Sequence, residues 1–273
     1  MTASEGRVEP GHGRNVPGSV ASGAAQPALR AVGLSKSFGA FRANDGVDLS
    51  LPGGARHALI GPNGAGKTTL VNLLTGRLAP SAGDVFLDGE RVTSLPEHAR
   101  VARGMTRTFQ INALFDGLSV FESLLLAVCQ RRGQGASWWR RLSRLDAEHR
   151  DVWSLLDRLR LSADAALLTR HLPYGKRRLL EIGLALATGP SILLLDEPAS
   201  GIPAAESRDM FEVIAALPRS VTLLFIEHDM GLVFRFAERI SVLVAGRVLC
   251  EGTPDEISKD ARVREVYLGG AVP

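Results

Sequence analysis

The sequence predicts an α/β fold built around a parallel sheet. Two apolar runs carry this prediction, because "SILLLDEP" (191–198) and "VTLLFIEHD" (221–229) are typical of continuous buried strands, and the helical pattern "AAESRDMFEVIAALP" lies between them. Continuous apolar strands that alternate with helices are typical of a parallel sheet covered on both faces. With 273 residues, of which 45% are hydrophobic and 22% charged, the chain can bury the core that such a fold needs.

The N-terminal part of the chain changes character near residue 28. Residues 1–27 are mostly Gly, Ser, Ala, Pro and charged side chains, which bury too little apolar surface to offset the entropy of ordering, so we predict a disordered tail. Three segments of strand length follow, "ALRAVGLSKSF", "GVDLSL" and "HALIG". "KTTLVNLLTGRL" then has the spacing of a helix, and "GDVFLDGERV" has the pattern of a strand.

The middle of the chain, about residues 94–190, is predicted to be mostly helical. "SVFESLLLAVCQRR" and "DAEHRDVWSLLDRLRL" place apolar side chains three or four residues apart. Between them, residues 131–145 hold five arginines and the pair Trp138 and Trp139. This segment can be interpreted as a membrane-surface or nucleic-acid patch. A surface insertion of the helical region is the preferred interpretation.

Bulk composition excludes several classes of protein. The net charge of +3 and the pI of about 9.2 are spread along the chain, which favours a solvated surface over a nucleic-acid interface. Cys129 and Cys250 lie far apart without a CxxC or His/Cys cluster, so neither a disulfide framework nor a structural zinc site is expected. No apolar run approaches the roughly 20 residues of a membrane-spanning helix, and the N-terminus lacks the apolar core of a signal peptide. We expect a cytosolic chain that meets a membrane only through a partner.

The stretch "GPNGAGKTT" fits the phosphate-loop pattern G-x-x-x-x-G-K-[ST] between a strand and a helix. Glycines allow successive backbone N–H groups to surround phosphates at a helix N-terminus, where the helix dipole also favours anions. Lys67 is expected to neutralise the β- and γ-phosphates, and the Thr68 hydroxyl to ligate Mg²⁺. The predicted loop comprises Gly61, Pro62, Asn63, Gly64, Ala65, Gly66, Lys67, Thr68 and Thr69.

A second acidic element complements this loop. The strand "ILLLDEP" ends in two adjacent carboxylates, which would be costly to bury unless a cation or ligand meets them. Asp196 is placed to hold Mg²⁺ through water, and Glu197 is the candidate that polarises the attacking water. A strand-end turn with solvated acids is the alternative, and the presence of the phosphate loop disfavours it.

With these motifs, the sequence resembles the ATP-binding subunits of ABC transporters over about residues 28–269. The resemblance implies a RecA-like parallel-sheet core, an antiparallel β subdomain, and an α-helical subdomain at about 111–188. It also implies ATP and Mg²⁺ as ligands. By the same resemblance, Gln110 in "TRTFQ" is the Q-loop glutamine that contacts Mg²⁺ or water, and His228 in "FIEHD" is the switch histidine that contacts the γ-phosphate.

The family also carries an aromatic side chain that stacks on adenine. Phe38 in "KSFGAF" lies at the family's distance before Lys67, so it is the predicted stacking residue, because stacking requires only a π-face. Phe41 is the competing candidate, with Phe38 then a core residue of the first strand.

The stretch "HLPYGKRRLLEIG" (171–183) occupies the place of the family's signature motif, usually LSGGQ. In the family, two domains dimerise head to tail, and this motif closes over ATP bound to the other chain. We therefore predict that Tyr174, Gly175 and Lys176 approach a partner's nucleotide. Pro173 stands at the position of the signature serine and offers no donor, and Pro203 stands at the usual D-loop aspartate. Both departures put the ordinary hydrolysis geometry in doubt, although not ATP binding.

With these departures, the sequence resembles the subfamily that imports branched-chain or other hydrophobic amino acids. The stretches that carry this resemblance are "DEPASGIP", "IEHDM" and the ending "EGTPDEISKDARVREVYLGG". The implied division is an ATPase domain at 28–254 and a subfamily-specific segment at 255–273. The implied partners are transmembrane permease subunits, a second ATP-binding subunit and, indirectly, a periplasmic solute-binding protein, without nucleic acid. A heterodimer is favoured over a homodimer. The implied location is the cytoplasmic face of the inner membrane, held there by the permease.

Two other functions compete with the transport ATPase. One is a soluble ABC ATPase that acts on DNA or ribosomes, which usually has two ATPase cassettes or a long coiled-coil insertion, and this chain shows neither. The other is a nucleotide-binding partner that contributes a degenerate signature motif to a heterodimer. Glu197 and His228 argue against lost hydrolysis at this chain's own site, whereas the altered signature would affect the partner's site.

Overall fold

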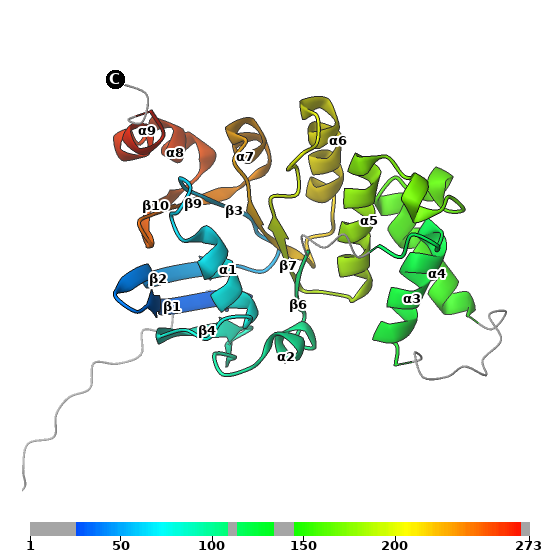
Figure 1. Ribbon diagram of the computed structural model, residues 1–273, viewed down its shortest axis with the longest axis horizontal. Helices are drawn as coiled ribbons and strands as arrows, with labels where there is room; N and C mark the ends of the chain where they lie inside the picture. Colours follow the sequence, from blue (N-terminus) through cyan, green and yellow to red (C-terminus); the bar gives the residue numbers. More distant parts are fainter. Residues whose placement is uncertain (1–25, 109–113, 134–144, 269–273) are drawn as a thin grey trace, which may run out of the picture.

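The computed structural model describes residues 26–108, 114–133 and 145–268, and the described residues form two sheets flanked by helices (Figure 1). The larger sheet has six strands in the order β10-β9-β3-β8-β7-β6. Its neighbours pair in parallel except β9 and β10, which pair antiparallel. The strands are β3 (Arg56–Ile60), β6 (Met105–Arg107), β7 (Ile192–Asp196), β8 (Thr222–Ile226), β9 (Arg239–Val244) and β10 (Arg247–Gly252). The predicted parallel core is confirmed.

Side chains of the central strands alternate between two hydrophobic cores. Along β7, Leu193 and Leu195 belong to one of these cores, whereas Ile192 and Leu194 belong to the core on the opposite face of the sheet. All four are at most 1% exposed. Burial on both faces explains why the sequence of this strand is continuously apolar instead of alternating.

The smaller sheet is antiparallel, with the strand order β2-β1-β4-β5. Its strands are β1 (Leu29–Phe38), β2 (Phe41–Leu51), β4 (Ala82–Leu87) and β5 (Glu90–Arg91). Helix α1 (Lys67–Thr75) packs between the two sheets, because Leu70, Leu73 and Leu74 share one core with side chains of both. The predicted strand "GDVFLDGERV" is instead a hairpin, since Asp88 and Gly89 adopt left-handed backbone conformations between β4 and β5.

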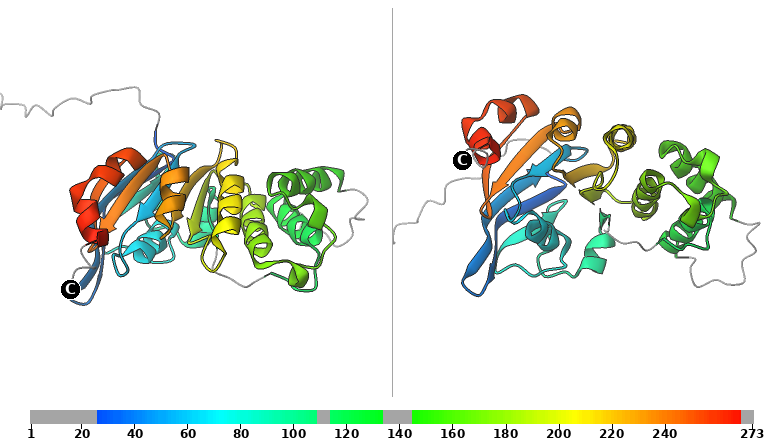
Figure 2. Two further views of the ribbon diagram at one scale, coloured as in Figure 1. Left: turned by 90° about the horizontal axis from the view of Figure 1, so that it is seen from above. Right: turned by 45° about the horizontal axis from the view of Figure 1, so that its top comes forward.

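A helical layer lies at the end of the molecule opposite to the antiparallel sheet, as Figures 1 and 2 show. It consists of α3 (Val120–Arg131), α4 (Asp146–Arg158), α5 (Tyr174–Ala187) and the short 3₁₀ helices Ser162–Asp164 and Thr169–His171. The remaining helices are α2 (Glu97–Val101), α6 (Ala204–Ala215), α7 (Met230–Phe236), α8 (Pro254–Lys259) and α9 (Ala261–Leu268). The α/β fold class with its antiparallel and helical parts is therefore confirmed.

Three sequence predictions fall wholly or largely outside the described residues. They are the disordered tail at 1–27, of which only Gln26 and Pro27 are described, the Q-loop residue Gln110, and the tryptophans of the 131–145 segment. The described arginines of that segment, Arg131 and Arg132, both pair with Asp151 of α4. Within the described parts of the chain, none of the helices has both the length and the hydropathy needed to cross a bilayer.

Candidate nucleotide-binding site

The phosphate loop connects β3 to α1 and ends in a glycine that the structure requires. Gly66 precedes α1 with a φ of 98°, a left-handed conformation that glycine adopts without strain. A Cβ atom at this position would lie 2.4 Å from the carbonyl oxygen of Ala43 and 2.9 Å from Nδ2 of Asn44. The loop therefore packs directly on β2, which leaves no space for a side chain.

Lys67 begins α1 and points back into the loop. Its ammonium group donates to the carbonyl oxygens of Gly61 at 2.7 Å and Pro62 at 3.0 Å, and the residue is only 7% exposed. Burial lowers the pKa of Lys67, and the nearby carboxylates of Glu197 and Asp196 oppose this shift. A partly desolvated cation beside a glycine-rich loop is suited to a phosphate.

A cavity of about 320 Å³ opens over the loop and brings residues from distant parts of the sequence together. It is lined by Phe41, Ala43, Asn63, Gly64, Ala65, Gly66, Lys67, Thr68, Thr69, Glu197 and His228. Seven of the nine predicted loop residues are in this lining, and the other two, Gly61 and Pro62, hold Lys67. Residues that follow β7 and β8 thus face the phosphate loop after β3, because all three strands are parallel and end at the same edge.

Glu197 and His228 contact each other at the edge of this cavity. One carboxylate oxygen of Glu197 lies 2.7 Å from Nε2 of His228, so an Nε2–H donates to the carboxylate. Their side chains are 32% and 46% exposed, which leaves the pair open to water. Glu197 also has a φ of 48°, a left-handed conformation that is unfavourable for a residue with a side chain and that aims its carboxylate at His228.

Asp196, the residue before it, is paired within the chain. Its carboxylate accepts a hydrogen bond from the guanidinium of Arg107, and both side chains are less than a tenth exposed. Arg107 also donates to Oδ1 of Asn72 on α1 at 2.7 Å. The buried carboxylate at the end of β7 therefore has a compensating cation from the neighbouring strand β6, as burial of a charge demands.

Glu227 is a third carboxylate in this region and lies between the two loops. It is 5% exposed and accepts from the backbone N–H of Ala199 at 2.9 Å and from that of His228 at 3.2 Å. Burial raises the pKa of Glu227, and the two backbone hydrogen bonds oppose the shift. The carboxylate therefore links the segment after Glu197 to the segment that carries His228.

The altered signature segment forms the start of α5. Pro173 occupies the position before the helix, and the side chain offers no cap, in agreement with its lack of a donor or acceptor. Pro203 stands at the equivalent position of α6. The φ angles of −55° at Pro173 and −57° at Pro203 lie in the range that the proline ring fixes, so both prolines are accommodated without strain before their helices.

The three cations of this segment are each engaged by a carboxylate of the helical region. Lys176 donates to both oxygens of Asp164 at 2.8 and 2.7 Å, and Arg177 to Asp116 at 3.0 Å. Arg178 donates to Glu181 at 2.7 Å. These ion pairs within the chain oppose the repulsion between the three cations and the positive end of the helix dipole.

Tyr174 points from α5 toward the segment after β7. Its hydroxyl donates to the carbonyl oxygen of Ser200 at 3.3 Å and accepts from Arg178 at 3.0 Å. Gly175 lies close to α6, since a Cβ on it would come 2.9 Å from a carboxylate oxygen of Glu206. Whether Tyr174, Gly175 and Lys176 approach a partner's nucleotide stays a prediction.

The two candidate adenine-stacking residues lie opposite each other in the β1–β2 hairpin. Phe41 is 64% exposed and lines the cavity, whereas Phe38 is 50% exposed, lies outside the lining and has the ammonium of Lys36 over its ring. The alternative in which Phe38 is a core residue does not agree with its exposure. Both phenylalanines can offer a ring face for stacking on adenine. Phe41 lies nearer to the phosphate loop, because it lines the cavity above that loop.

The donor set suits a hard divalent cation bound together with a phosphate. Thr68 lines the cavity, whereas Asp196 is paired with Arg107 outside the lining, and both offer the oxygen ligands that Mg²⁺ prefers. In the described residues, no group of three or more His, Cys, Asp or Glu side chains is arranged to hold a metal ion by itself. One carboxylate, one hydroxyl and the substrate's own oxygens form the usual Mg²⁺ site of phosphoryl-transfer enzymes, so the residues fit this ion.

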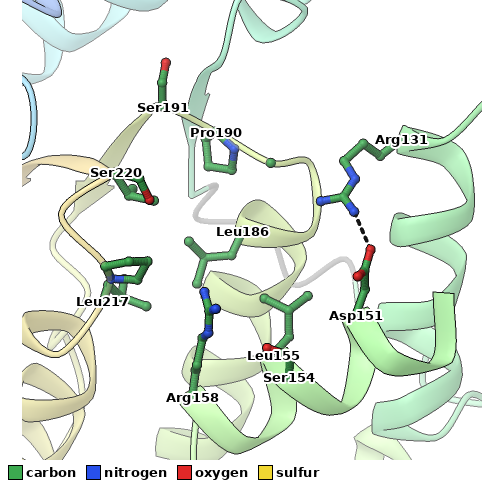
Figure 3. Close-up of a pocket in the computed structure, with 13 residues that line it drawn as sticks. Arg131, Asp151, Ser154, Leu155, Arg158, Leu186, Pro190, Ser191, Leu217 and Ser220 are labelled. Carbon is green, nitrogen blue, oxygen red and sulfur yellow. Dashed lines mark hydrogen bonds and ion pairs between the residues drawn. The ribbon is translucent and has the colours of Figure 1, made fainter. Parts of the chain in front are cut away.

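A second cavity, of about 450 Å³, lies at the opposite edge of the sheet (Figure 3). Ser191 and Ser220, which precede β7 and β8, form one side of it, and the Arg131–Asp151 ion pair forms the other. Because parallel strands place their N-terminal ends together, this cavity is separated from the phosphate loop by the length of the strands. It contributes no residue to the candidate site.

Comparison with known proteins identifies the family. A family model described as "ABC transporter" matches residues 44–200, more than half of the chain. The chain belongs to the ABC transporter family. A second model, "Branched-chain amino acid ATP-binding cassette transporter", matches residues 247–273. The ABC ATPase is 38% identical over 257 residues to the high-affinity branched-chain amino acid transport ATP-binding protein BraF of Pseudomonas aeruginosa, covering 90% of this chain and 99% of BraF.

Other relatives agree with this assignment. LivG of Escherichia coli (strain K12), described in the same words as BraF, is 38% identical over 255 residues, with 90% of this chain and 99% of LivG covered. Among solved structures, the ADP conformation of MJ1267, an ATP-binding cassette of an ABC transporter, superimposes with a TM-score of 0.78 at 29% identity. That match covers 89% of this ABC ATPase and 99% of MJ1267. The predicted family, its branch and the ATPase activity are therefore confirmed.

Three residues of the site were not assigned from the sequence. Arg107 and Glu227 lie inside the quoted motifs "TRTFQ" and "FIEHD", but their partners come from other segments, so the motifs alone gave no role. Tyr267 of α9 is the third. Burial raises its pKa to about 12, and a hydrogen bond with the Gly61 backbone opposes the shift. The C-terminal segment therefore contacts the phosphate loop. For Glu227, the sequence offered one signal, which is an acidic residue directly after the apolar strand β8.

Proposed function

We propose that this ABC ATPase drives the import of branched-chain or other hydrophobic amino acids through a membrane permease. The support for the solute class is the similarity to BraF and LivG, which extends over 99% of their lengths. The match of residues 247–273 to the branched-chain transporter model adds to it, because this segment lies beyond the part that matches the general ABC transporter model. The solute itself contacts the permease and a solute-binding protein rather than this chain.

The observation that supports the chemistry best is the contact of Glu197 with His228 beside the phosphate loop. In hydrolysis, a water oxygen forms a bond to the γ-phosphorus, and the bond from that phosphorus to the bridging oxygen breaks. Glu197 accepts a proton of the attacking water, and ADP and phosphate leave. His228 orients the carboxylate and meets the γ-phosphate. Lys67 exchanges its two loop carbonyls for β- and γ-phosphate oxygens, which it neutralises.

Other groups complete the nucleotide site. Thr68 and Asp196, with Gln110, would hold Mg²⁺, which when bound neutralises charge on the phosphates. Asp196, which is paired with Arg107, would hold Mg²⁺ through water. Phe41 or Phe38 stacks on the adenine base.

The working form is a head-to-tail dimer in which the start of α5 meets the partner's nucleotide. Gly175 and Lys176 offer backbone N–H groups there, whereas Pro173 cannot supply the usual serine hydroxyl. The partner is a related ATP-binding subunit or a second copy of this chain. Permease contacts hold the pair at the cytoplasmic face of the membrane. The proposed division is an N-terminal tail at 1–27, an ATPase domain at 28–254 with a helical subdomain at about 111–188, and a C-terminal segment at 255–273.

Mg²⁺-dependent ATP hydrolysis tests the chemistry. Specific activity of the purified chain is measured as its concentration is raised, with Glu197→Gln as the blank. Glu212→Gln, the same change on the exposed face of α6, is the matched control. Activity that rises with concentration and vanishes only in Glu197→Gln supports hydrolysis by a homodimer. ATP binding without turnover at any concentration contradicts the homodimer and indicates a different partner subunit.

Leucine uptake tests the solute class. The chain is expressed in Escherichia coli that lacks LivG, and accumulation of radiolabelled leucine is compared with that of a hydrophilic amino acid. Uptake of leucine that depends on Glu197 supports the proposal. If the chain assembles with the permease and still restores no branched-chain uptake, the proposed solute class is wrong.

A further inference from the structure

Glu197 adopts a backbone conformation that requires support from its surroundings. Its φ of 48° costs free energy in any residue with a Cβ atom, so neighbouring groups must hold the segment in place. Within the backbone, the N–H of Glu197 donates to the carbonyl of Ile226, and the N–H of Ser200 donates to the carbonyl of Glu197, both at 3.0 Å. These bonds define a tight loop from Glu197 to Ser200 directly after β7.

Glu227 closes this loop from the side of β8. Its carboxylate accepts from Ala199 with one oxygen and from His228 with the other, at 2.9 and 3.2 Å. The backbones that carry Glu197 and His228 are therefore joined by Glu227, while their side chains join at 2.7 Å on the cavity side. No cation pairs with Glu227 in the part of the chain that the structure describes, so these two N–H groups are the partners of a nearly buried acid.

Tyr174 closes the same loop from the side of α5. Its hydroxyl donates to the carbonyl of Ser200, and Gly201 is so near that a Cβ there would lie 3.5 Å from the ring. Arg178, one turn along α5, donates to the hydroxyl and lies over the ring. The first residue of the signature helix therefore contacts the segment that positions Glu197.

We propose that Glu227 and Tyr174 are positioning residues that hold the Ala199–Ser200 segment from opposite sides and so couple the signature helix to the Glu197–His228 pair. The inference rests on the proposed ATPase chemistry. Neither side chain lines the phosphate-loop cavity of its own chain. A movement of α5 pulls on the Ser200 carbonyl, shifts the loop, and changes how the Glu197 carboxylate meets His228. Closure of the helical region is thereby transmitted to the site in the same chain.

Amide hydrogen exchange tests the physical link without any need for turnover. Exchange of the peptide that covers residues 197–202 is followed in the full chain by mass spectrometry. Glu227→Gln keeps one acceptor oxygen and loses the other, and Tyr174→Phe keeps the ring and loses the donor. We expect each variant to accelerate exchange in this peptide about fivefold, the effect of one lost hydrogen bond. Tyr174 is 47% exposed, so its variant folds even if the Glu227 variant does not. Exchange equal to that of the wild type in Tyr174→Phe overturns the inference.

Steady-state kinetics test the coupling. We expect each variant to lower kcat about fivefold, with KM for ATP changed less than about twofold. The double variant should lose less than the product of the two single effects, because both act through one segment. Glu212→Gln, which is remote, should behave as wild type. A multiplicative double variant, or equal changes in KM and kcat, contradicts a shared positioning role. If the purified wild type itself shows no turnover above Glu197→Gln, the homodimer is not the working form, and the exchange experiment still decides the link.

Discussion

His57 in the central strand β3 makes the stability of the fold depend on pH. The residue is fully buried, and burial lowers its pKa from 6.5 to about 4, while Glu251 raises it and Arg239 lowers it. Nε2 lies 2.8 Å from the Ser241 hydroxyl, which itself donates to Glu251 at 3.0 Å, so Nε2 carries the proton of a neutral ring. Nδ1 is buried and has no hydrogen-bond partner among the described residues. A second proton on Nδ1 would therefore be a buried charge without an acceptor.

The sign and size of the effect follow from this pKa. A histidine whose pKa is lower in the folded than in the unfolded state contributes its full stability above pH 6.5 and loses it as the pH falls toward 4. Below that pH the loss reaches about 3 kcal/mol, at about 1.4 kcal/mol per pKa unit. Between about pH 7 and pH 5 it amounts to about 2 kcal/mol, because the unfolded chain is then mostly protonated at this site and the folded chain is not.

Urea unfolding at the two pH values measures this loss. In His57→Gln, the amide nitrogen can still donate to Ser241, but the side chain no longer titrates. Other groups contribute equally to both proteins, so the difference between the two pH-induced changes isolates His57. We expect wild type to lose about 2 kcal/mol more than the variant over this interval. Equal losses in the two proteins would refute the argument that the buried ring stays neutral.

Three further changes test other parts of the structure. Lys67→Ala should weaken ATP binding about tenfold or more, measured by titration calorimetry, because it removes the partly desolvated cation of the phosphate loop; unchanged affinity would exclude Lys67 from the site. Arg100→Met should cost about 3 kcal/mol of unfolding free energy, since the buried guanidinium donates to carbonyls that end α1, including those of Leu73 and Leu74. A loss below about 1 kcal/mol would mean that water replaces the guanidinium as the donor to these carbonyls. Ser119→Ala should cost about 1 kcal/mol in urea unfolding by removing the capping box of α3, and a neutral result would show that packing alone determines this helix start.

Much of the fold and of the site could be predicted because the relevant signals are local. The apolar strands that end at Asp196 and at Ile226 are buried on both faces, so their sequences are continuous and easily recognised. The phosphate loop depends on residues that are adjacent in the chain. Glu197 was a candidate because it directly follows an apolar strand that ends in an acid, and His228 was a candidate through the family resemblance of "FIEHD".

The remaining features depend on partners that are distant in the sequence. Whether Phe38 or Phe41 lines the cavity depends on where the β1–β2 hairpin turns relative to the loop, which the composition of "KSFGAF" does not encode. Lys176 meets Asp164 through the packing of the helical region, and no short stretch of the sequence shows this contact.

The sequence by itself determined the α/β class, the phosphate loop, the acidic strand end and the family, because each is encoded by residue types at short and regular spacing. Only the tertiary structure decided what those groups contact. Arg107 reaches Asp196 across neighbouring strands, and Glu227 joins Ala199 to His228 across two loops. Such pairings depend on strand order and on the burial of charge, since an acid removed from water must find its partner in space rather than along the chain.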